Sequence, residues 1–257
     1  MKHNILGKSL LCAAALISLG AARADVLDFE SVDTTHAPFA PLLSDGDYVT
    51  QGANYLQIFD PNNDTGVPWL EQAGSLINAS ADAGGCLDAV CPAGNATSYV
   101  VSTNDSVMQF GRLDAGTTAL GSFDAAFLAP AGATLTSGTV AFLAIQADRA
   151  DGTTATGVFA LGGPDSTGTT AFKTFQASQA QIIGGTGTLS SGAATYYAYA
   201  YYCDGTGDCS AFSSNKGQFA LDNIALNVSA VPEPQSWLLM SLGLVAIGAR
   251  ANRRRSA

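Results

Sequence analysis

The sequence predicts a mainly β protein, an antiparallel β-sandwich of a jelly-roll-like type with helices only near its two ends. Glycine, alanine, serine and threonine are abundant and turn signals are frequent. No long central stretch repeats its apolar residues with a helical period. Strand signals fall on residues 26–30, 55–59, 99–102, 107–110, 122–128, 139–147, 156–161, 171–175, 195–203 and 219–228.

One strand shows the alternation clearly. Tyr197, Tyr199 and Tyr201 alternate with Ala198, Ala200 and Tyr202. Because successive side chains of a strand point to opposite faces, this predicts an aromatic face on one side of a sheet. Such a face either packs in the core, as large aromatic residues usually do, or stacks on the flat faces of sugar rings.

The N-terminus reads as a secretory signal peptide, residues 1–24. Lys2 and Lys8 flank the start of an apolar run over residues 9–19, and Ala22-Arg23-Ala24 supplies a small-residue cleavage site before Asp25. We therefore expect a short signal helix that is removed on export, and an oxidising environment for the rest of the chain.

The predicted exported domain, residues 25–228, is strongly acidic. Residues 25–231 contain 20 acidic residues against four basic ones, a net charge of −16. Phosphate binding needs a basic surface, so nucleic acid is excluded as a partner. This composition suits a soluble extracellular surface, and its many aspartates suit divalent cations.

Four cysteines follow the signal peptide: Cys86, Cys91, Cys203 and Cys209. An even number in an oxidising compartment predicts disulfides. The spacing favours Cys86–Cys91 and Cys203–Cys209, although four cysteines allow two other connectivities. Neither pair has the Cys-x-x-Cys spacing of a zinc site.

Residues 60–94 are expected to be loop-rich, and they begin with a calcium-loop pattern. Asp60, Asn62 and Asp64 occupy positions one, three and five, and Glu71 occupies position twelve. Thr65 replaces the required glycine at position six, and no amphipathic helix flanks the loop. The pattern indicates either a calcium loop or a plain surface turn.

No catalytic set is evident, so we expect no enzymatic activity. The exported domain has a single histidine, His36, in a segment that reads as an exposed loop, and it lacks a Gly-x-Ser-x-Gly elbow. Its only glutamates are Glu30 and Glu71, and no glycine-rich segment has the ending of a phosphate loop.

Trp69 is a candidate ligand-binding residue. It is the only tryptophan of residues 25–228 and lies in the loop-like segment Val67-Pro68-Trp69-Leu70-Glu71. An exposed ring there would stack on a sugar, and a buried one would pack in the core.

The C-terminus has three parts. A linker over residues 229–235 contains Val231-Pro232-Glu233-Pro234, an apolar run extends from Trp237 to Ala249, and the basic residues Arg250, Arg253, Arg254 and Arg255 follow. As a helix this run would rise about 20 Å, short of the roughly 30 Å hydrocarbon core. We therefore expect residues 236–257 to form a transmembrane helix that is only just long enough to insert, with its arginines in the cytoplasm. Such a helix would serve as a temporary membrane anchor.

This tail, residues 231–257, resembles the PEP-CTERM sorting signal. The resemblance implies that an exosortase is a partner and that the protein is exported through the inner membrane. It also implies transient anchoring by the C-terminal helix, processing near Pro232-Glu233-Pro234, and a final place at the cell surface or outside the cell. Such proteins are commonly associated with exopolysaccharide, which makes extracellular polysaccharide a second expected partner.

The domain edges carry a second resemblance. Gln218-Phe219-Ala220-Leu221-Asp222 looks like the Gln-Phe-x-x-Asp signature of one PEP-CTERM group, and Leu27-Asp28-Phe29-Glu30 looks like its first strand. In similar jelly-roll carbohydrate-binding modules, acids on the first and last strands can share a structural calcium. By that analogy Glu30 and Asp222 are calcium candidates; the alternative is strand-end solvation and turn capping.

These observations favour a structural or glycan-binding component of a polysaccharide matrix or biofilm. A secreted polysaccharide hydrolase would instead need clustered carboxylates in a groove. An ice-binding or other surface-binding module is allowed by threonine-rich segments such as 153–154 and 167–170, which form no regular array.

Overall fold

The computed structural model describes residues 24–61, 72–78, 86, 89–130, 140–166, 168–212 and 216–228. They belong to one compact unit that ends at Val228. The predicted signal helix before Ala24, the linker and the C-terminal helix lie outside the described residues. Among the residues described, none forms a helix both long and apolar enough to cross a membrane.

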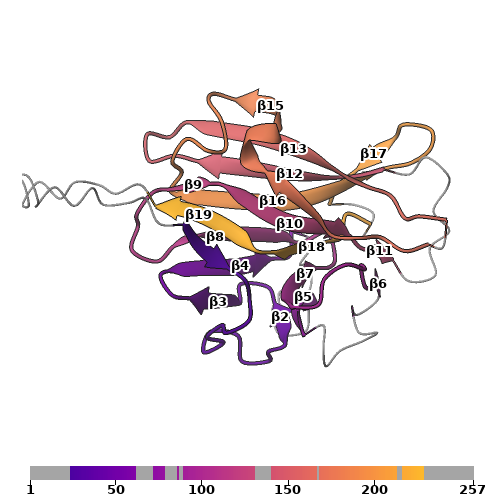
Figure 1. The fold of residues 1–257 in the computed structure, drawn as a ribbon, viewed down its shortest axis with the longest axis horizontal. Coiled ribbons are helices and arrows are strands. Elements are labelled where there is room, and N and C mark those ends of the chain that lie inside the picture. The colour runs from indigo at the N-terminus through magenta and orange to yellow at the C-terminus, as the bar shows by residue number, and fades with distance from the viewer. Residues whose placement is uncertain are drawn as a thin grey trace, which may run out of the picture. The chain divides into compact units, whose positions relative to one another are not determined.

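Two antiparallel sheets dominate the structure (Figure 1). The larger contains, in spatial order, β15 (Gln181–Gly185), β13 (Thr154–Gly162), β12 (Val140–Asp148), β16 (Thr195–Cys203), β8 (Val107–Arg112), β4 (Asn54–Phe59) and β3 (Tyr48–Gln51), with β17 (Cys209–Ser210) beside β16. The six-stranded sheet contains β14 (Lys173–Gln176), β10 (Ser122–Phe127), β18 (Phe219–Asp222), β7 (Ser98–Ser102), β5 (Gln72–Asn78) and β2 (Leu42–Ser44).

Short strands extend this framework. One small sheet contains β1 (Ala24–Leu27), β19 (Ile224–Val228) and β9 (Thr118–Leu120), and another pairs β11 (Ala129–Pro130) with β6 (Ala89–Val90). Asn223, with a φ of 49°, separates β18 from β19. Gly121 separates β9 from β10. Its N–H donates to the carbonyl of Ala225 at 2.9 Å, so this break lies beside β19, next to the break at Asn223.

The chain crosses repeatedly between the two large sheets. It passes from β7 to β8, back to β10 and on to β12, which forms a hairpin with β13. It then crosses to β14, returns to β15 and β16, and crosses a last time to β18. A 3-10 turn, η3 (Ala177–Gln179), follows β14.

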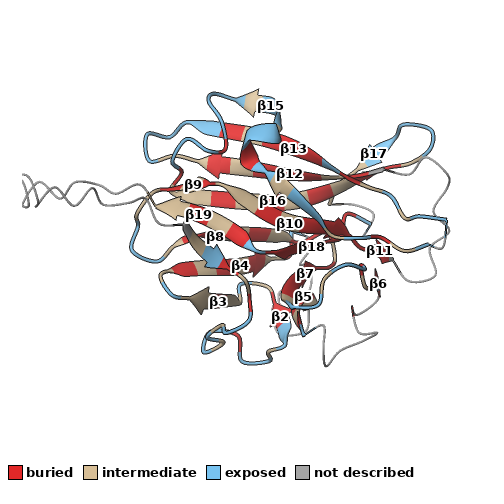
Figure 2. Cartoon of the chain, in the orientation of Figure 1, coloured by how far each residue is buried: buried red, intermediate tan, exposed pale blue. Residues whose placement is uncertain are grey.

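The main core lies between the two sheets (Figure 2). Phe123 of β10 meets Phe159 of β13 edge to face at 4.9 Å between ring centroids. A second, smaller cluster lies on the other face of the six-stranded sheet, where Val101 and Ala220 point away from the main core. Its buried members are Ile77, Cys86, Ala89, Tyr99, Val101, Leu128 and Ala220.

The structure confirms the predicted antiparallel β architecture and corrects parts of it. The first strand ends at Leu27, before the predicted 26–30 segment is complete, because Phe29 has a φ of 57°. The region predicted as loop-rich contains β5. A Cβ on Gly74 of that strand would collide with the Val101 carbonyl oxygen and with Ile58, so close packing requires a glycine of low strand propensity there.

Candidate functional site

Strand β16 separates its tyrosines between two faces. Tyr196, Ala198 and Ala200 are buried in the core, whereas Tyr197, Tyr199 and Tyr201 are half-exposed on the outer face of the eight-stranded sheet. This follows from the two-residue period of a strand. Of the two interpretations that the sequence leaves open for these tyrosines, core packing therefore does not hold for the three that face outward.

Tyr196 fixes the strand from the inside. Its hydroxyl shares its single proton between the carbonyl oxygens of Thr118 at 2.8 Å and Leu189 at 2.9 Å, and its oxygen accepts the Leu120 N–H at 2.9 Å. Its ring stacks on Phe110 at 5.4 Å. Burial raises the pKa of Tyr196 to about 12. The hydroxyl thus stays neutral and bonded, which holds β16 rigidly beneath its outward side chains.

A row of polar and aromatic side chains crosses the outer face. Direct cross-strand pairs join Gln146 to Tyr197, Tyr197 to Gln109, Gln109 to Gln57, and Gln57 to Tyr48. All five side chains are half-exposed. Neighbouring strands lie about 4.8 Å apart, so the row spans roughly 19 Å.

Tyr55 is held beside this row. It pairs with Gly111 across β4 and β8, and an added Cβ on Gly111 would stand 3.4 Å from the Tyr55 ring. The Tyr55 hydroxyl accepts a hydrogen bond from Gln109 Nε2 at 2.8 Å. The missing side chain at Gly111 leaves room for the ring to lie against the sheet.

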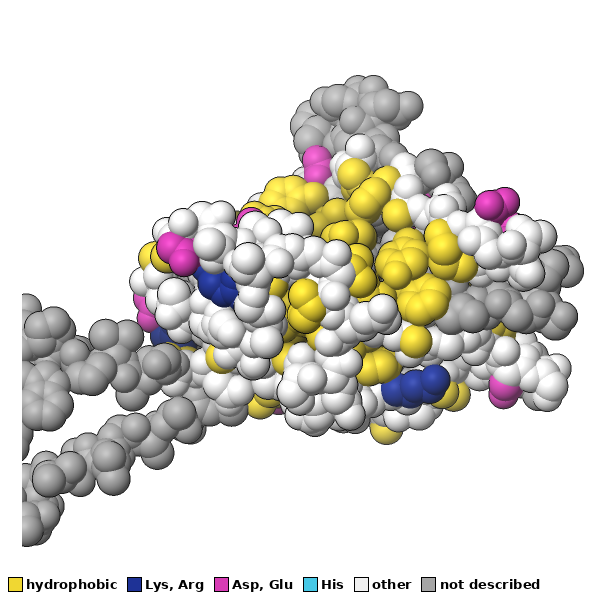
Figure 3. All heavy atoms as spheres, turned by 90° about the horizontal axis from the view of Figure 1, so that it is seen from above, with side chains coloured by type: hydrophobic (Ala, Val, Ile, Leu, Met, Phe, Trp, Pro, Cys, Tyr) yellow, Lys and Arg dark blue, Asp and Glu magenta, His cyan; other side chains and the backbone are white. Residues whose placement is uncertain are grey.

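Aromatic contacts continue along β16. Tyr201 stacks on Phe142 at 5.1 Å, and Tyr199 meets Phe212 at 5.3 Å in a tilted arrangement. Phe212 follows the loop that the Cys203–Cys209 disulfide closes. Figure 3 views the molecule from the side of β15 and β13, and hydrophobic side chains gather in the middle of that view while charged ones lie mainly toward its margins.

We call this surface the tyrosine–glutamine face; it comprises Tyr48, Tyr55, Gln57, Gln109, Gln146, Tyr197, Tyr199 and Tyr201. Asp148 lies at its edge, where Gln146 Nε2 donates to Asp148 Oδ1 at 2.7 Å. Partial burial raises the pKa of Tyr197, and the nearby Asp148 and Tyr55 add to that rise. The face offers flat rings for stacking and uncharged amides that both donate and accept hydrogen bonds.

The two calcium candidates at the domain edges, Glu30 and Asp222, both accept hydrogen bonds from one segment of the chain. Strand β1 pairs with β19, as expected for the terminal strands. Glu30 accepts the Ser98 N–H at 2.7 Å, and Asp222 Oδ2 accepts from Asn95 at 2.8 Å and from Thr97 at 3.0 Å. Glu30 and Asp222 therefore converge on residues 95–98, but through hydrogen bonds that need no metal.

Asp222 is a buried carboxyl group. It is 0% exposed, and its Oδ1 accepts the Asn223 N–H at 2.7 Å. Burial raises its pKa to about 6 against these hydrogen bonds, and Asp124 on the neighbouring strand adds to the rise. Within the described ranges no group of three or more His, Cys, Asp or Glu side chains is placed to hold a metal ion. Calcium at Glu30 and Asp222 stays a prediction.

The other predicted residues divide between described and undescribed segments. Asp60 is buried at the end of β4, and its N–H donates to Asp45 Oδ1 at 2.9 Å. Asn62, Asp64, Glu71 and Trp69 lie outside the described residues, so the calcium loop and the tryptophan site stay predictions. His36 is exposed and stacks on Tyr48 at 4.2 Å.

Both favoured disulfides are present. The Cα atoms of Cys86 and Cys91 are 5.1 Å apart, and those of Cys203 and Cys209 are 4.0 Å apart.

The sequence alone did not indicate that Tyr55 and the three glutamines of the tyrosine–glutamine face are candidate binding residues. Alternation within residues 54–59 and 107–112 would have placed Tyr55, Gln57 and Gln109 outward, but only strand pairing brings them beside Tyr197.

Comparison with protein families identifies the tail. Residues 230–255 match the model of the PEP-CTERM protein-sorting motif, which confirms the resemblance of the C-terminal segment. The matched segment includes Val231, Pro232, Glu233, Pro234 and Trp237 and the arginines from Arg250 to Arg255. This motif marks exported proteins for exosortase-dependent sorting. A search of curated proteins gives no match, and the Gln-Phe-x-x-Asp signature at residues 218–222 stays a prediction.

Proposed function

We propose that this exosortase-sorted protein is a non-enzymatic, glycan-binding component of the cell surface or extracellular polysaccharide. The carrying observation is the tyrosine–glutamine face, on which Tyr197, Tyr199 and Tyr201 stay half-exposed. Sugar rings present apolar C–H faces and hydroxyl edges. Tyrosine rings can stack on the apolar C–H faces, and glutamine amides can form hydrogen bonds with the hydroxyl groups.

The strand winding supports a jelly-roll fold for this binding domain. Strands β14, β10, β18 and β7 are consecutive neighbours within the six-stranded sheet, and β13, β12, β16 and β8 are consecutive neighbours within the eight-stranded sheet. The chain visits them in the order β7, β8, β10, β12, β13, β14, β16 and β18, which crosses between layers except at the β12–β13 hairpin. Fold alone assigns no ligand, so the proposal rests on the face.

Charge favours a neutral glycan. The net charge of −16 over residues 25–231 would repel an acidic polysaccharide at low ionic strength. The tyrosine–glutamine face consists of tyrosines and glutamines and includes no Asp, Glu, Lys or Arg. Stacking and amide hydrogen bonds, which tolerate salt, would therefore provide the affinity.

The proposed route follows from the tail. Exosortase is the processing partner, and the C-terminal helix, residues 236–257, is a temporary membrane anchor until cleavage near Pro232-Glu233-Pro234. The signal peptide, residues 1–24, starts export. Cleavage would release residues 25–228 on the outer side of the membrane, where an extracellular polysaccharide is available.

The direct test is retention of the purified protein on the neutral polysaccharide of its own host, measured by affinity electrophoresis. We expect the combined change Tyr197→Ala, Tyr199→Ala and Tyr201→Ala to weaken retention at least about tenfold, because each stacked ring contributes about 1 kcal/mol. Binding unchanged in that triple variant, with a native urea midpoint, would refute the assignment of this face.

Phe39 provides a matched control. It is an aromatic residue that is 55% exposed, and it lies on the segment between β1 and β2, outside the tyrosine–glutamine face. Phe39→Ala should leave retention unchanged. A comparable loss in Phe39→Ala would show that retention results from nonspecific adsorption through any exposed aromatic ring.

A further inference from the structure

The two large sheets have four edge strands, β2, β14, β3 and β15. An edge strand presents backbone N–H and C=O groups on its outer side, where a strand of another chain can pair with them. Proteins protect such edges with a covering segment, a very short strand, proline or charged side chains. The chain itself covers β3, because the Thr50 N–H donates to the Asp33 carbonyl at 3.1 Å and the Asp33 N–H donates to the Thr50 carbonyl at 2.8 Å.

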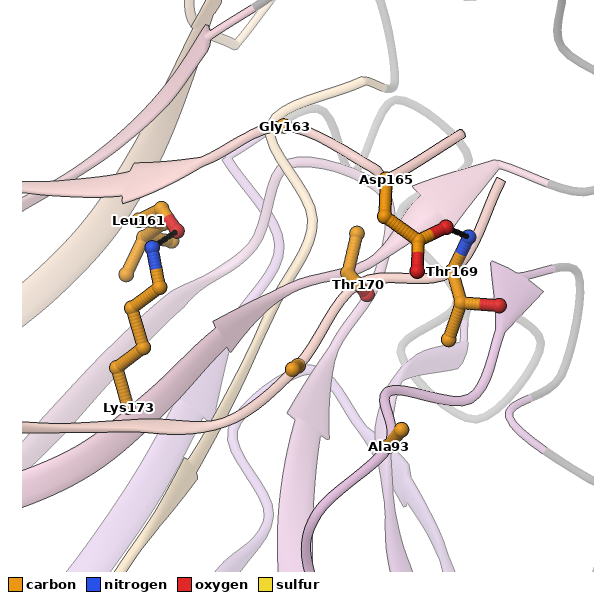
Figure 4. Close-up of a pocket in the computed structure, with 8 residues that line it drawn as sticks. Ala93, Leu161, Gly163, Asp165, Thr169, Thr170 and Lys173 are labelled. Carbon is orange, nitrogen blue, oxygen red and sulfur yellow. Dashed lines mark hydrogen bonds between the residues drawn. The ribbon is translucent and has the colours of Figure 1, made fainter. Parts of the chain in front are cut away.

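The two edges of the six-stranded sheet are protected in other ways. Strand β2 is only three residues long, and it lies between Pro41 and Asp45. Strand β14 begins with the exposed Lys173, whose Nζ donates to the Leu161 carbonyl of β13 at 3.2 Å (Figure 4). That lysine adds a positive charge to the edge of β14. Both edges therefore have features that discourage pairing with another strand.

Strand β15 lacks this protection. Among the described residues it is the last strand on its side of the eight-stranded sheet. No Asp, Glu, Lys, Arg or Pro occurs from Thr174 to Cys203, a segment that includes all of β15. Ile182 and Ile183 are 39% and 59% exposed. The pairing with β13 skips Ile183, so this residue forms a β-bulge that presents an exposed isoleucine where a protected edge would have a charge.

Charge indicates which strand this edge can accept. Residues 25–231 have a net charge of −16, so two copies of the chain repel each other at low ionic strength. The uncharged segment 174–203 adds nothing to that repulsion. In the view from the side of β15 and β13, charged side chains lie mainly toward the margins (Figure 3). Two copies can therefore approach each other with least repulsion at β15, and each offers the other the same uncharged strand.

We propose that β15 pairs antiparallel with β15 of a second copy of this chain, which joins the two eight-stranded sheets into one continuous sheet. Two antiparallel copies of one strand are related by a twofold axis perpendicular to the sheet, so the contact closes as a dimer. Full pairing of residues 181–185 sets Ile183 opposite the same residue of the second copy.

This symmetry keeps the outer faces of both sheets on the same side. The dimer would then present two tyrosine–glutamine faces to one polysaccharide chain, which raises the avidity. That consequence rests on the proposed function, whereas the pairing itself does not.

Sedimentation equilibrium of the full-length chain in a density-matched detergent tests the pairing. A strand of five residues buries less area than a stable interface, so we expect a weak dimer with a dissociation constant on the order of 100 μM. Ile183→Lys should raise that constant at least about tenfold, because it sets two positive charges against each other. Its urea midpoint should match that of the wild type, since the side chain is mostly exposed.

Leu113→Lys is the matched control. Leu113 is 55% exposed, follows β8 and lies outside β15, and its replacement changes the net charge by the same amount. It should dimerise like the wild type. Equal dissociation constants for wild type and Ile183→Lys would show that another surface, such as the apolar tail, joins the copies.

Cross-linking tests the register. Residues directly opposite each other in an antiparallel pair have Cα atoms about 4.5–5.5 Å apart, which a disulfide can span. Ile183→Cys should therefore form a covalent dimer with oxidised glutathione on non-reducing electrophoresis, and Leu113→Cys should not. The proposal fails if both cysteine variants cross-link equally. It also fails if the wild type stays monomeric at about 1 mM, which would leave β15 to a strand of another protein.

Discussion

The outer faces of the two large sheets differ in what covers them. On the six-stranded sheet, Cys86 and Ala89 form the second core cluster with residues such as Val101 of β7 and Ala220 of β18, and Asn95 and Thr97 donate hydrogen bonds to Asp222. On the eight-stranded sheet, the tyrosine–glutamine face leaves its rings half-exposed. One face is closed by the chain's own residues, and the other is open.

This difference separates stability from binding. The covered face satisfies the buried Asp222 carboxylate internally: Oδ2 accepts hydrogen bonds from Asn95 and Thr97, and Oδ1 accepts one from the Asn223 N–H. On the open face, some polar side chains form hydrogen bonds with one another; for example, Gln109 Nε2 donates to the Tyr55 hydroxyl. A half-exposed surface of rings and amides adds little to folding, which is why we assign it to ligand binding.

Removing the two disulfides should have the largest effect on stability of the changes considered for this contrast. The two can be compared directly, because they close loops of similar length, with separations of 5 and 6 residues. Chain entropy alone predicts about 2 kcal/mol for each. Changing Cys86 and Cys91 together to alanine should cost about 3 kcal/mol by urea denaturation, since Cys86 is buried in the second core cluster.

The same change at Cys203 and Cys209 should cost about 2 kcal/mol, because Cys209 is exposed. It should also weaken polysaccharide retention, since that loop leads to Phe212, which contacts Tyr199. Equal stability losses in the two variants, with retention unaffected in both, would contradict the division between a covered and an open face.

The next effect concerns the buried carboxyl of the covered face. The pKa of Asp222 is raised to about 6, so the folded protein binds this proton more tightly than the unfolded chain. Stability should therefore rise as the pH falls from 7 through 6 and below the unfolded pKa near 3.8, by about 3 kcal/mol in full. Urea denaturation at pH 7.5 and 5.0 measures the part of this gain that falls in that interval, about 1.4 kcal/mol.

Asp222→Asn is the matched variant for that measurement. It lacks the titrating group, so its stability should change less over the same interval. Asp47 also has a pKa raised by burial, and it remains in both proteins, so its contribution cancels in the comparison. Parallel pH profiles for wild type and variant would show that the Asp222 carboxyl does not control this dependence.

Several features could be predicted from the sequence because their signals are local. The alternation of residues 195–203 places β16 at the bounds that the structure gives. The short spacing within each cysteine pair indicates both disulfides. The sorting tail depends only on the order of its proline-rich, apolar and basic parts, and the family match confirms it.

Other features depend on contacts between distant segments. Strand β5 has a weak local signal, because Gly74 is required by its packing against Val101. The direction in which Tyr197 faces depends on which sheet side meets the core.

The smallest expected effect concerns one hydrogen bond on the open face. Gln109 Nε2 donates to the Tyr55 hydroxyl at 2.8 Å, which orients a ring that lies over Gly111. Gln109→Met or Tyr55→Phe should each weaken polysaccharide retention about twofold to threefold, with stability changed by less than about 0.5 kcal/mol. The double variant should be no weaker than either single one, because both remove the same bond. Independent, multiplying losses would mean that each side chain contacts the glycan separately, and that their mutual bond does not organise the face.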